Sequence, residues 1–237
     1  MSPLSFGIGN SRAFGIASSV PPEPFSLIYD FSNTSCYSGS GSTISDLSGS
    51  SNSTIVGASF DPSGFFLLNS ASQGDGYIVM NDPKPEISPV FTIEMWVSFN
   101  TLFNGQIVLD NRFSVNGGIV AYVELFNSDF RLRFTKMSNG FLAPTALSTG
   151  TFYHFVVTQS SSQVITYTNN TRSTSSLTAS DFSASIINPF HFGISSINTG
   201  TSSSSNINLY EFRMYDRALS IAEVDARFQE SRTKYGI

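Results

Sequence analysis

The chain has 237 residues, a formal net charge of −5 and a pI near 4.9, and only 12% of its residues are charged. With 22 Phe and 40% hydrophobic residues it can bury a sizeable core, and all-β chains of this length commonly form one domain. Its 12 basic residues are scattered, unlike the clustered positive surface of a nucleic-acid-binding protein. No stretch approaches the roughly 18 consecutive apolar residues of a membrane span. We therefore expect neither nucleic acid nor membrane as a partner.

Residues 1–24 are predicted to form an extended arm ahead of the domain, because small residues and glycines lead into Pro21, Pro22 and Pro24. One interpretation is a frayed terminus. The other is a partner-docking arm, since apolar side chains gain from burial only against another surface. The residues of this docking arm are Leu4, Phe6, Ile8, Phe14 and Ile16. Gly, Asn, Ser and Arg interrupt the apolar residues here, so we expect that this segment is not a signal peptide. We expect the protein to be synthesised in the cytoplasm.

From residue 25 onward the chain reads as one domain of short strands separated by turn residues. The expected strands cover residues 26–31, 64–69, 76–81, 90–100, 106–110, 118–127, 130–136, 151–159, 164–170, 188–194 and 206–215. Residues 34–54 are predicted to be a flexible polar loop that leaves the single cysteine, Cys36, inert or facing solvent. The strand at 151–159 is apolar on both faces, so we place it centrally in a sandwich, with 164–170 as its hairpin partner.

Residues 90–100 give the clearest alternation. Odd-numbered apolar residues from Phe91 to Phe99 share one face, and Thr92, Glu94, Trp96 and Ser98 share the other. We expect Trp96 to lie in the core.

The C-terminal stretch combines a strand with the only helix signal. Tyr210, Phe212 and Met214 are expected on one face of the strand, with Leu209, Glu211 and Arg213 on the other, where Glu211 and Arg213 can pair. A helix over about 220–232 follows, because Ser220 and Glu223 have the spacing of a capping box. Leu219 and Val224 fit a hydrophobic staple, and the apolar stripe is Ile221, Val224 and Phe228.

Three segments, in this order, resemble the laminin-G-like, concanavalin A-like lectin/glucanase domains. They are "FTIEMWVSFN" at 91–100, "GTFYHFVVTQSSSQVITYTNNTRS" at 150–173 and "NLYEFRMYDRALSIAEV" at 208–224. The resemblance covers roughly residues 25–232 and implies an all-β, two-sheet antiparallel jelly-roll sandwich with one short C-terminal helix. The final "FQESRTKYGI" and the Gly-rich arm are similar to single-domain versions of this fold in virus and phage particle proteins.

The residues do not favour catalysis. Glucanases of the resembled superfamily carry the strand motif E-x-D-x-x-E, and glycoside hydrolysis needs two carboxyl groups around one bond. Glu94 and Glu124 have no carboxylate at the alternating positions beside them. His154 and His191 lie within Phe-rich strands, where a packed, hydrogen-bonded role is the usual one. We expect no enzyme activity and no catalytic residues.

Two kinds of binding site stay open as alternatives. Several members of the resembled fold hold calcium at the sandwich rim, and Asp110 and Asn111, which end a strand, are the rim candidates for a metal. Turn formation explains both residues equally well, so no cofactor is expected. A glycan site needs exposed aromatic rings beside amides and carboxylates; Tyr37, Phe103, Phe141 and Tyr153 are candidates for the rings.

These patterns favour a non-enzymatic structural or decoration protein of a viral particle, attached through its apolar arm and sandwich surface. Its expected partners are a capsid or other particle protein and further copies of itself, and its expected location is the virion. Low charge suits such close packing because few charges must be desolvated. The alternative is a carbohydrate-binding module, or a host-recognition lectin, that holds a surface glycan.

Overall fold

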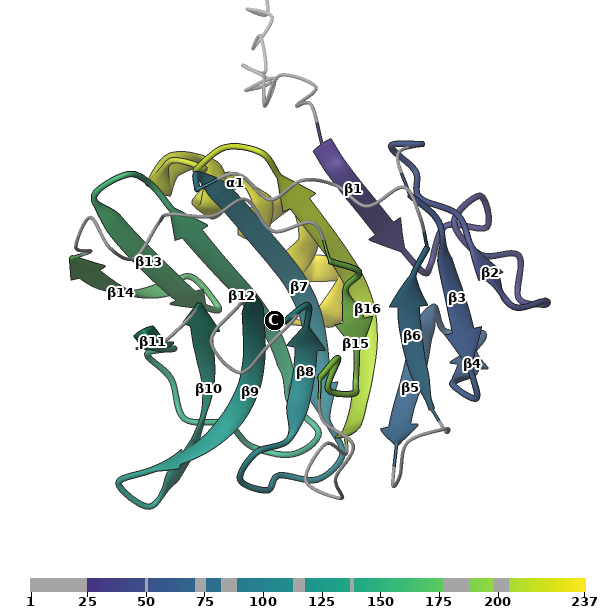
Figure 1. The fold of residues 1–237 in the computed structure, drawn as a ribbon, viewed down its shortest axis with the longest axis horizontal. Helices are drawn as coiled ribbons and strands as arrows, with labels where there is room; N and C mark the ends of the chain where they lie inside the picture. Colours follow the sequence, from purple (N-terminus) through teal and green to yellow (C-terminus); the bar gives the residue numbers. More distant parts are fainter. Residues whose placement is uncertain are drawn as a thin grey trace, which may run out of the picture.

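The computed structural model describes residues 25–49, 51–70, 76–81, 89–112, 118–136, 139–176, 188–197 and 205–237. Residues 1–24, with all five of the expected docking-arm residues, lie outside these ranges. Within them the chain forms two stacked antiparallel sheets with one short α-helix behind them (Figure 1). The predicted two-sheet sandwich with a single C-terminal helix is confirmed.

Sheet A carries the helix on its outer face. In spatial order its strands are β14 (Thr171–Ser176), β13 (Gln163–Thr168), β12 (Phe152–Gln159), β7 (Phe91–Phe99), β16 (Ser205–Tyr215), β5 (Phe65–Ser70) and β4 (Ser59–Asp61). β1 (Phe25–Asp30) pairs with the C-terminal half of β16, and β5 pairs with its N-terminal half. β12 lies between β7 and β13, as its two apolar faces predict.

Sheet B covers the inner face of sheet A. Its order is β11 (Asn139–Leu142), β10 (Asp129–Lys136), β9 (Ile119–Phe126), β8 (Ile107–Asp110), β15 (His191–Phe192), β6 (Tyr77–Met80), β3 (Ser53–Val56) and β2 (Thr43–Ile44). The β9–β10 and β13–β14 turns each have two residues at positive φ, Asn127–Ser128 and Asn169–Asn170. Two-residue hairpins need this conformation, and asparagine tolerates it better than most residues.

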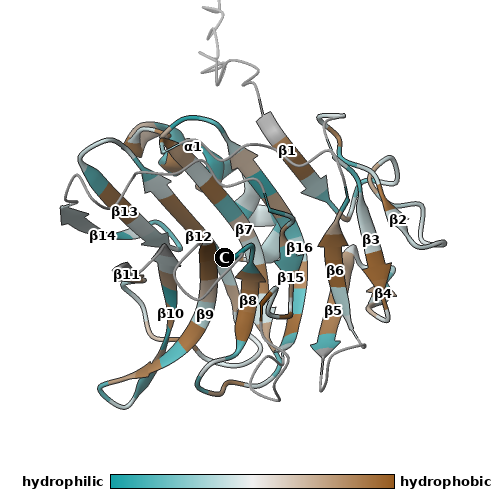
Figure 2. Ribbon diagram, in the orientation of Figure 1, coloured by the Kyte–Doolittle hydropathy of each residue, from teal (hydrophilic) through white to brown (hydrophobic). Residues whose placement is uncertain are grey.

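The core lies between the sheets and follows the alternation of the strands (Figure 2). On β7 the side chains of Ile93, Met95 and Val97 enter this core. The opposite face of β7 is buried as well, because the helix covers it, so all nine residues of the strand are buried. Trp96 is completely buried on this second face, which confirms its expected core position.

The helix α1 (Ile221–Ser231) continues into a 3₁₀ turn, η3 (Arg232–Tyr235). The capping box is present: Ser220 Oγ accepts from the Glu223 N–H at 3.3 Å, and Glu223 Oε2 accepts from the Ser220 N–H at 2.7 Å. Val224 and Phe228 are buried against sheet A, whereas Ile221 is 40% exposed, so its place in the apolar stripe is wrong. No helix in the described ranges combines the length and apolar character needed to cross a membrane.

Two other expectations need correction. A bulge between Leu209 and Glu211 shifts the register of β16, so Leu209 joins the core while Tyr210 turns outward with Glu211. The stretch predicted as a flexible loop, residues 34–54, contains β2 and the start of β3, and its Cys36, Tyr37 and Ile44 pack into the core. Cys36 is 1% exposed there, so the solvent-facing alternative is wrong; burial raises the pKa of its thiol to about 12, which agrees with the inert alternative. Neighbouring apolar residues supply this burial, which composition alone did not show.

Candidate functional site

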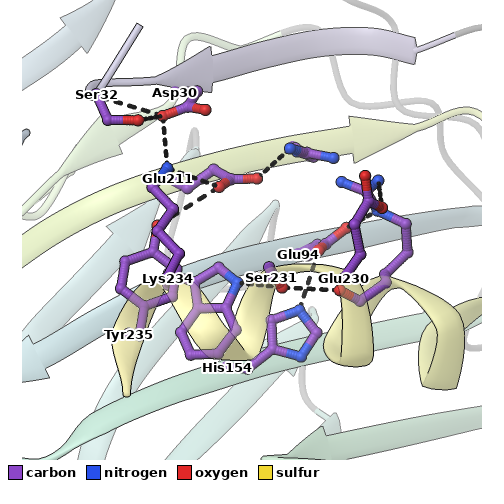
Figure 3. A network of polar contacts seen from close by, with 12 residues as sticks. Asp30, Ser32, Glu94, His154, Glu211, Glu230, Ser231, Lys234 and Tyr235 are labelled. Atoms are coloured by element: carbon purple, nitrogen blue, oxygen red, sulfur yellow. Dashed lines mark hydrogen bonds and ion pairs between the residues drawn. The ribbon is translucent and has the colours of Figure 1, made fainter. Parts of the chain in front are cut away.

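The outer face of sheet A carries two surfaces that differ in access. One is a set of charged and aromatic groups buried beneath α1 and η3, which we call the helix-anchoring network (Figure 3). The other is a groove whose described lining residues come from strands and the segments beside them, not from α1 or η3. The network contains the groups from which an active site would be built, so it is considered first.

Glu94 is the centre of the network and is 1% exposed. Its Oε1 lies 3.0 Å from His154 Nε2, and its Oε2 accepts from the Tyr215 hydroxyl at 2.7 Å. Arg227 of α1 approaches the same Oε2 at 3.6 Å through Nε. Burial alone would raise the pKa of Glu94, but the hydrogen bonds and nearby positive charge outweigh it and hold the pKa below its ordinary value. Glu94 is therefore an ionised carboxylate that joins β7 to β12, β16 and the helix.

Aromatic rings surround this carboxylate and complete the contact with the helix. The Trp96 ring lies between that of Tyr235, at 4.2 Å between centroids, and that of His154, at 4.7 Å. Phe228 stacks on Trp96 at 6.2 Å. The indole N–H donates to Ser231 Oγ at 3.1 Å, so its polar atom is satisfied inside the contact.

A second carboxylate, Glu211, holds the end of the chain. It pairs with Arg213 on the same strand, as the sequence predicts. Its Oε2 lies 3.8 Å from Lys234 Nζ, which also binds Asp30 at 3.0 Å. Lys234 therefore ties η3 to both β16 and β1. Burial raises the pKa of Glu211 to about 7, and the charges of Glu94 and Asp30 add to this effect.

This raised pKa predicts a specific dependence of stability on pH. The carboxyl binds its proton more tightly in the folded protein than in the unfolded chain, whose ordinary pKa is 4.5. The stabilisation from Glu211 is therefore complete below pH 4.5 and is lost as the pH rises through about 7. We expect the free energy of unfolding to fall by about 1–3 kcal/mol between pH 5 and pH 8.

Urea unfolding at a series of pH values measures this slope, and Glu211→Gln is its control. The amide cannot titrate, so the variant is expected to have a flatter profile in this range whatever its absolute stability. Equal slopes in the two proteins would assign the pH dependence to another group.

The helix-anchoring network is closed to a substrate in this structure. Glu94 and Glu211 are on adjacent strands, but both are at most 2% exposed and lie beneath α1 and η3. A glycosidase needs two carboxyl groups on either side of an accessible bond. The geometry is that of a contact that fastens the helix to the sheet.

The groove lies on the same face and has a volume of about 450 Å³. Asp61 of β4 faces Phe65 of β5, and Leu67 of β5 faces Asn208 of β16. The lining residues are Ser59, Phe60, Asp61, Phe65, Leu67, Asn100, Asn206 and Asn208. We call this surface the asparagine groove; it combines an apolar floor with amides and one carboxylate.

The amides of the groove orient one another. Asn100 Nδ2 donates to Oδ1 of Asn206 at 3.1 Å and to Oδ1 of Asn208 at 3.0 Å. Asn208 Nδ2 in turn donates to Ser98 Oγ at 3.2 Å. These contacts leave Asn206 Nδ2 and Asp61 Oδ2 without a partner among the described residues. The groove thus presents an acceptor, Asp61, opposite the half-buried Phe65, and a donor, Asn206, further along the sheet.

The rim candidates for calcium are already engaged. Asp110 Oδ1 accepts from the backbone N–H and the Nε of Arg112, each at 2.9 Å, and its Oδ2 accepts from Arg112 Nη2 at 2.7 Å. Asn111 Oδ1 accepts from the Ile119 N–H at 2.8 Å. Across the described ranges no three His, Cys, Asp or Glu side chains gather as metal ligands. The geometry at Asp110 therefore fits a guanidinium rather than calcium, which needs oxygen ligands with free lone pairs.

Most of the aromatic candidates for a glycan site are buried. Tyr37, Phe141 and Tyr153 are at most 8% exposed and belong to the core, so these three predictions are wrong; Phe103 is half-buried. The sequence reasoning missed the asparagines of the groove. Asn206 and Asn208 alternate along β16, which places two amides on one face, but their proximity to Asn100 depends on strand pairing.

The family comparison agrees with the architecture. A model described as the concanavalin A-like lectin/glucanases superfamily matches residues 72–225, well over half of the chain. The chain belongs to this superfamily. A comparison with curated proteins gives no match.

Solved structures share the fold at low sequence identity. Trypanosoma rangeli sialidase in complex with sialic acid superposes with a TM-score of 0.65 at 15% identity, over 89% of this chain and 33% of the sialidase. The binding domain of botulinum neurotoxin DC in complex with rat synaptotagmin II gives a TM-score of 0.64 at 14% identity, over 87% of this chain and 52% of that domain. The chain thus spans about a third of the first and half of the second. At these identities the likeness shows the fold alone.

Proposed function

We propose that this protein is a non-catalytic carbohydrate-binding module whose ligand is an uncharged sugar held in the asparagine groove. The groove is the observation that carries the proposal. Its volume of about 450 Å³ falls within the roughly 300–1,000 Å³ range of small-molecule sites. The family includes lectins by its description.

The chemistry of the groove suits sugar hydroxyls. Asn206 Nδ2 can donate to one hydroxyl of the sugar, and the Asp61 carboxylate can accept from another, while the apolar face of a ring packs on Phe65 and Leu67. Asp61 is the one charged residue among the described residues of the lining, and its carboxylate disfavours an anionic ligand at this position. The proposal therefore excludes acidic sugars from this groove.

Asn206→Ala and Asp61→Asn test the proposal. Each removes one groove hydrogen bond, so we expect about tenfold weaker binding of a neutral oligosaccharide identified on a glycan array. Isothermal titration calorimetry measures the affinity, with EDTA present to exclude a metal contribution. Asn104→Ala, an exposed asparagine outside the groove, is the control and is expected to bind as the parent does. If neither Asn206→Ala nor Asp61→Asn weakens binding, the glycan binds outside the asparagine groove.

Particle attachment through the arm stays a prediction, together with the capsid partner, self-association and the virion location. It has a direct test, because β1 begins at Phe25 and deletion of residues 1–24 removes no described strand. The hypothesis expects the shortened protein to fold with unchanged stability and to lose co-sedimentation with particles. Normal co-sedimentation of the shortened protein would show that the arm is not the attachment device.

A further inference from the structure

A second pocket, on sheet B, is built around an arginine that the sequence reasoning did not single out. The pocket has a volume of about 340 Å³ and is lined by Arg112, Asn188, Pro189, His191, Ser196 and Ile197. His191 of β15 lies directly beside Asp110 of β8 in the sheet, and Arg112 follows β8 in the chain. The pocket is therefore assembled from two neighbouring strand ends, and its described lining residues differ from those of the asparagine groove.

The guanidinium of Arg112 is held in one orientation. Its Nε and Nη2 form a fork on the two oxygens of Asp110, at 2.9 and 2.7 Å. Asp110 is completely buried and also accepts from Ser195 Oγ at 3.0 Å and the Ser196 N–H at 3.1 Å. Ser196 Oγ donates to the Arg112 carbonyl at 2.8 Å, which fixes the backbone as well. A buried carboxylate with this many donors is a rigid support for the arginine.

The remaining nitrogen of this arginine is not engaged by any residue that the structure describes. Nη1 has no partner among the described residues, and the Arg112 side chain is 20% exposed. Arg112 is among the described lining residues of the pocket, whereas Asp110 is not and is completely buried, so the positive partner of the ion pair faces the pocket. Partial burial lowers the pKa of His191 below its ordinary value, so its ring is neutral at pH 7. Arg112 is then the one charged group among the described lining residues.

We propose that this pocket binds the carboxylate of a small acidic ligand the size of one sugar ring, with Arg112 Nη1 as the principal donor. Arginine suits this role because its planar guanidinium donates in fixed directions and is always charged. Asn188 and Ser196 add polar groups, and Pro189 and Ile197 add apolar surface for the rest of the ligand. This site is independent of the proposed neutral-sugar groove, and its ligand has the charge that the groove excludes.

Titration with sodium D-glucuronate, using D-glucose as the uncharged match, tests the inference. The backbone amide signals of Ser196 and Ile197 are followed by ¹H–¹⁵N NMR at pH 7. We expect glucuronate to shift them in a saturable manner and glucose to leave them unchanged. Glucose shifts of equal size, or no shift with glucuronate, would overturn the proposal.

Two variants connect such binding to the pocket. Asn188→Asp places a like charge in the lining without touching the Asp110–Arg112 pair, and we expect it to weaken glucuronate binding at least about tenfold. Asn69→Asp adds the same charge on an exposed position of sheet A and should bind glucuronate as the parent does. Arg112→Lys keeps the charge but loses the fork, so we expect about tenfold weaker binding here too. If Asn188→Asp binds glucuronate as tightly as the parent does, the ligand carboxylate does not bind in this pocket. This conclusion holds whether or not Arg112→Lys folds.

Discussion

Replacing Glu94 by alanine is expected to destabilise the folded protein by about 3–5 kcal/mol, because it breaks a buried ionic network on one side only. The change leaves the Tyr215 hydroxyl, His154 Nε2 and Arg227 without their shared acceptor beneath α1. Urea unfolding monitored by tryptophan emission measures the loss, since Trp96 is the single tryptophan of the chain and lies within the network.

Glu124→Ala is the matched control. Glu124 is also a strand glutamate paired with an arginine, at 2.7 Å from Arg133. Its pair is 23% and 32% exposed, however, and solvent-exposed pairs contribute about 0–1 kcal/mol. If the free energy of unfolding falls by the same small amount in both variants, the network does not hold the helix on the sheet in the way its geometry indicates.

Phe228→Ala is expected to cost about 3–5 kcal/mol, the usual range for removing a buried aromatic side chain. Phe228 is 6% exposed and its ring lies against Trp96 and His154. The cavity should also let water reach Trp96, so the emission of the folded variant is expected to shift to longer wavelength. Differential scanning calorimetry and fluorescence spectra measure the two effects.

The same helix supplies the control for this substitution. Ile221→Ala removes a side chain that is 40% exposed and replaces it with the best helix former. We therefore expect a change within about 0.5 kcal/mol. A loss at Ile221 as large as that at Phe228 would mean that α1 contacts sheet A by a different face.

The fold was predictable where local signals and burial agree. The alternation on β7 identified a strand with two buried faces, and Ser220 with Glu223 located the start of α1. The bulge at Tyr210 was not predictable, because alternation assumes an unbroken register and nothing in "NLYEF" marks the extra residue. The exposure of Ile221 has a similar cause. Helical spacing predicts which residues lie on the apolar side of the helix, but how many of them are buried depends on the contact with sheet A.

The candidate sites were less predictable than the fold. Aromatic residues are numerous in this chain, so choosing exposed ones by type selected Tyr37 and Tyr153 from the core. Asp110 was identified as a charged residue at a strand end, but its partner is the arginine two residues later. Both pockets depend on which strands are neighbours. That information is contained in strand pairing rather than in any local motif.

The position of β16 has a consequence for how the chain acquires this structure. It lies in the middle of sheet A, between β7 and the pair β5 and β1, yet its residues, Ser205–Tyr215, follow every other described strand of this sheet in sequence. During synthesis the strands on either side of β16 leave the ribosome before it, and the edges that pair with β16 stay unpaired until β16 itself has emerged. Pairing between Phe25–Asp30 and Glu211–Tyr215 also joins segments at opposite ends of the domain, which makes folding slow relative to proteins with local contacts. Sheet A can therefore be completed only after residues 205–215 have been synthesised.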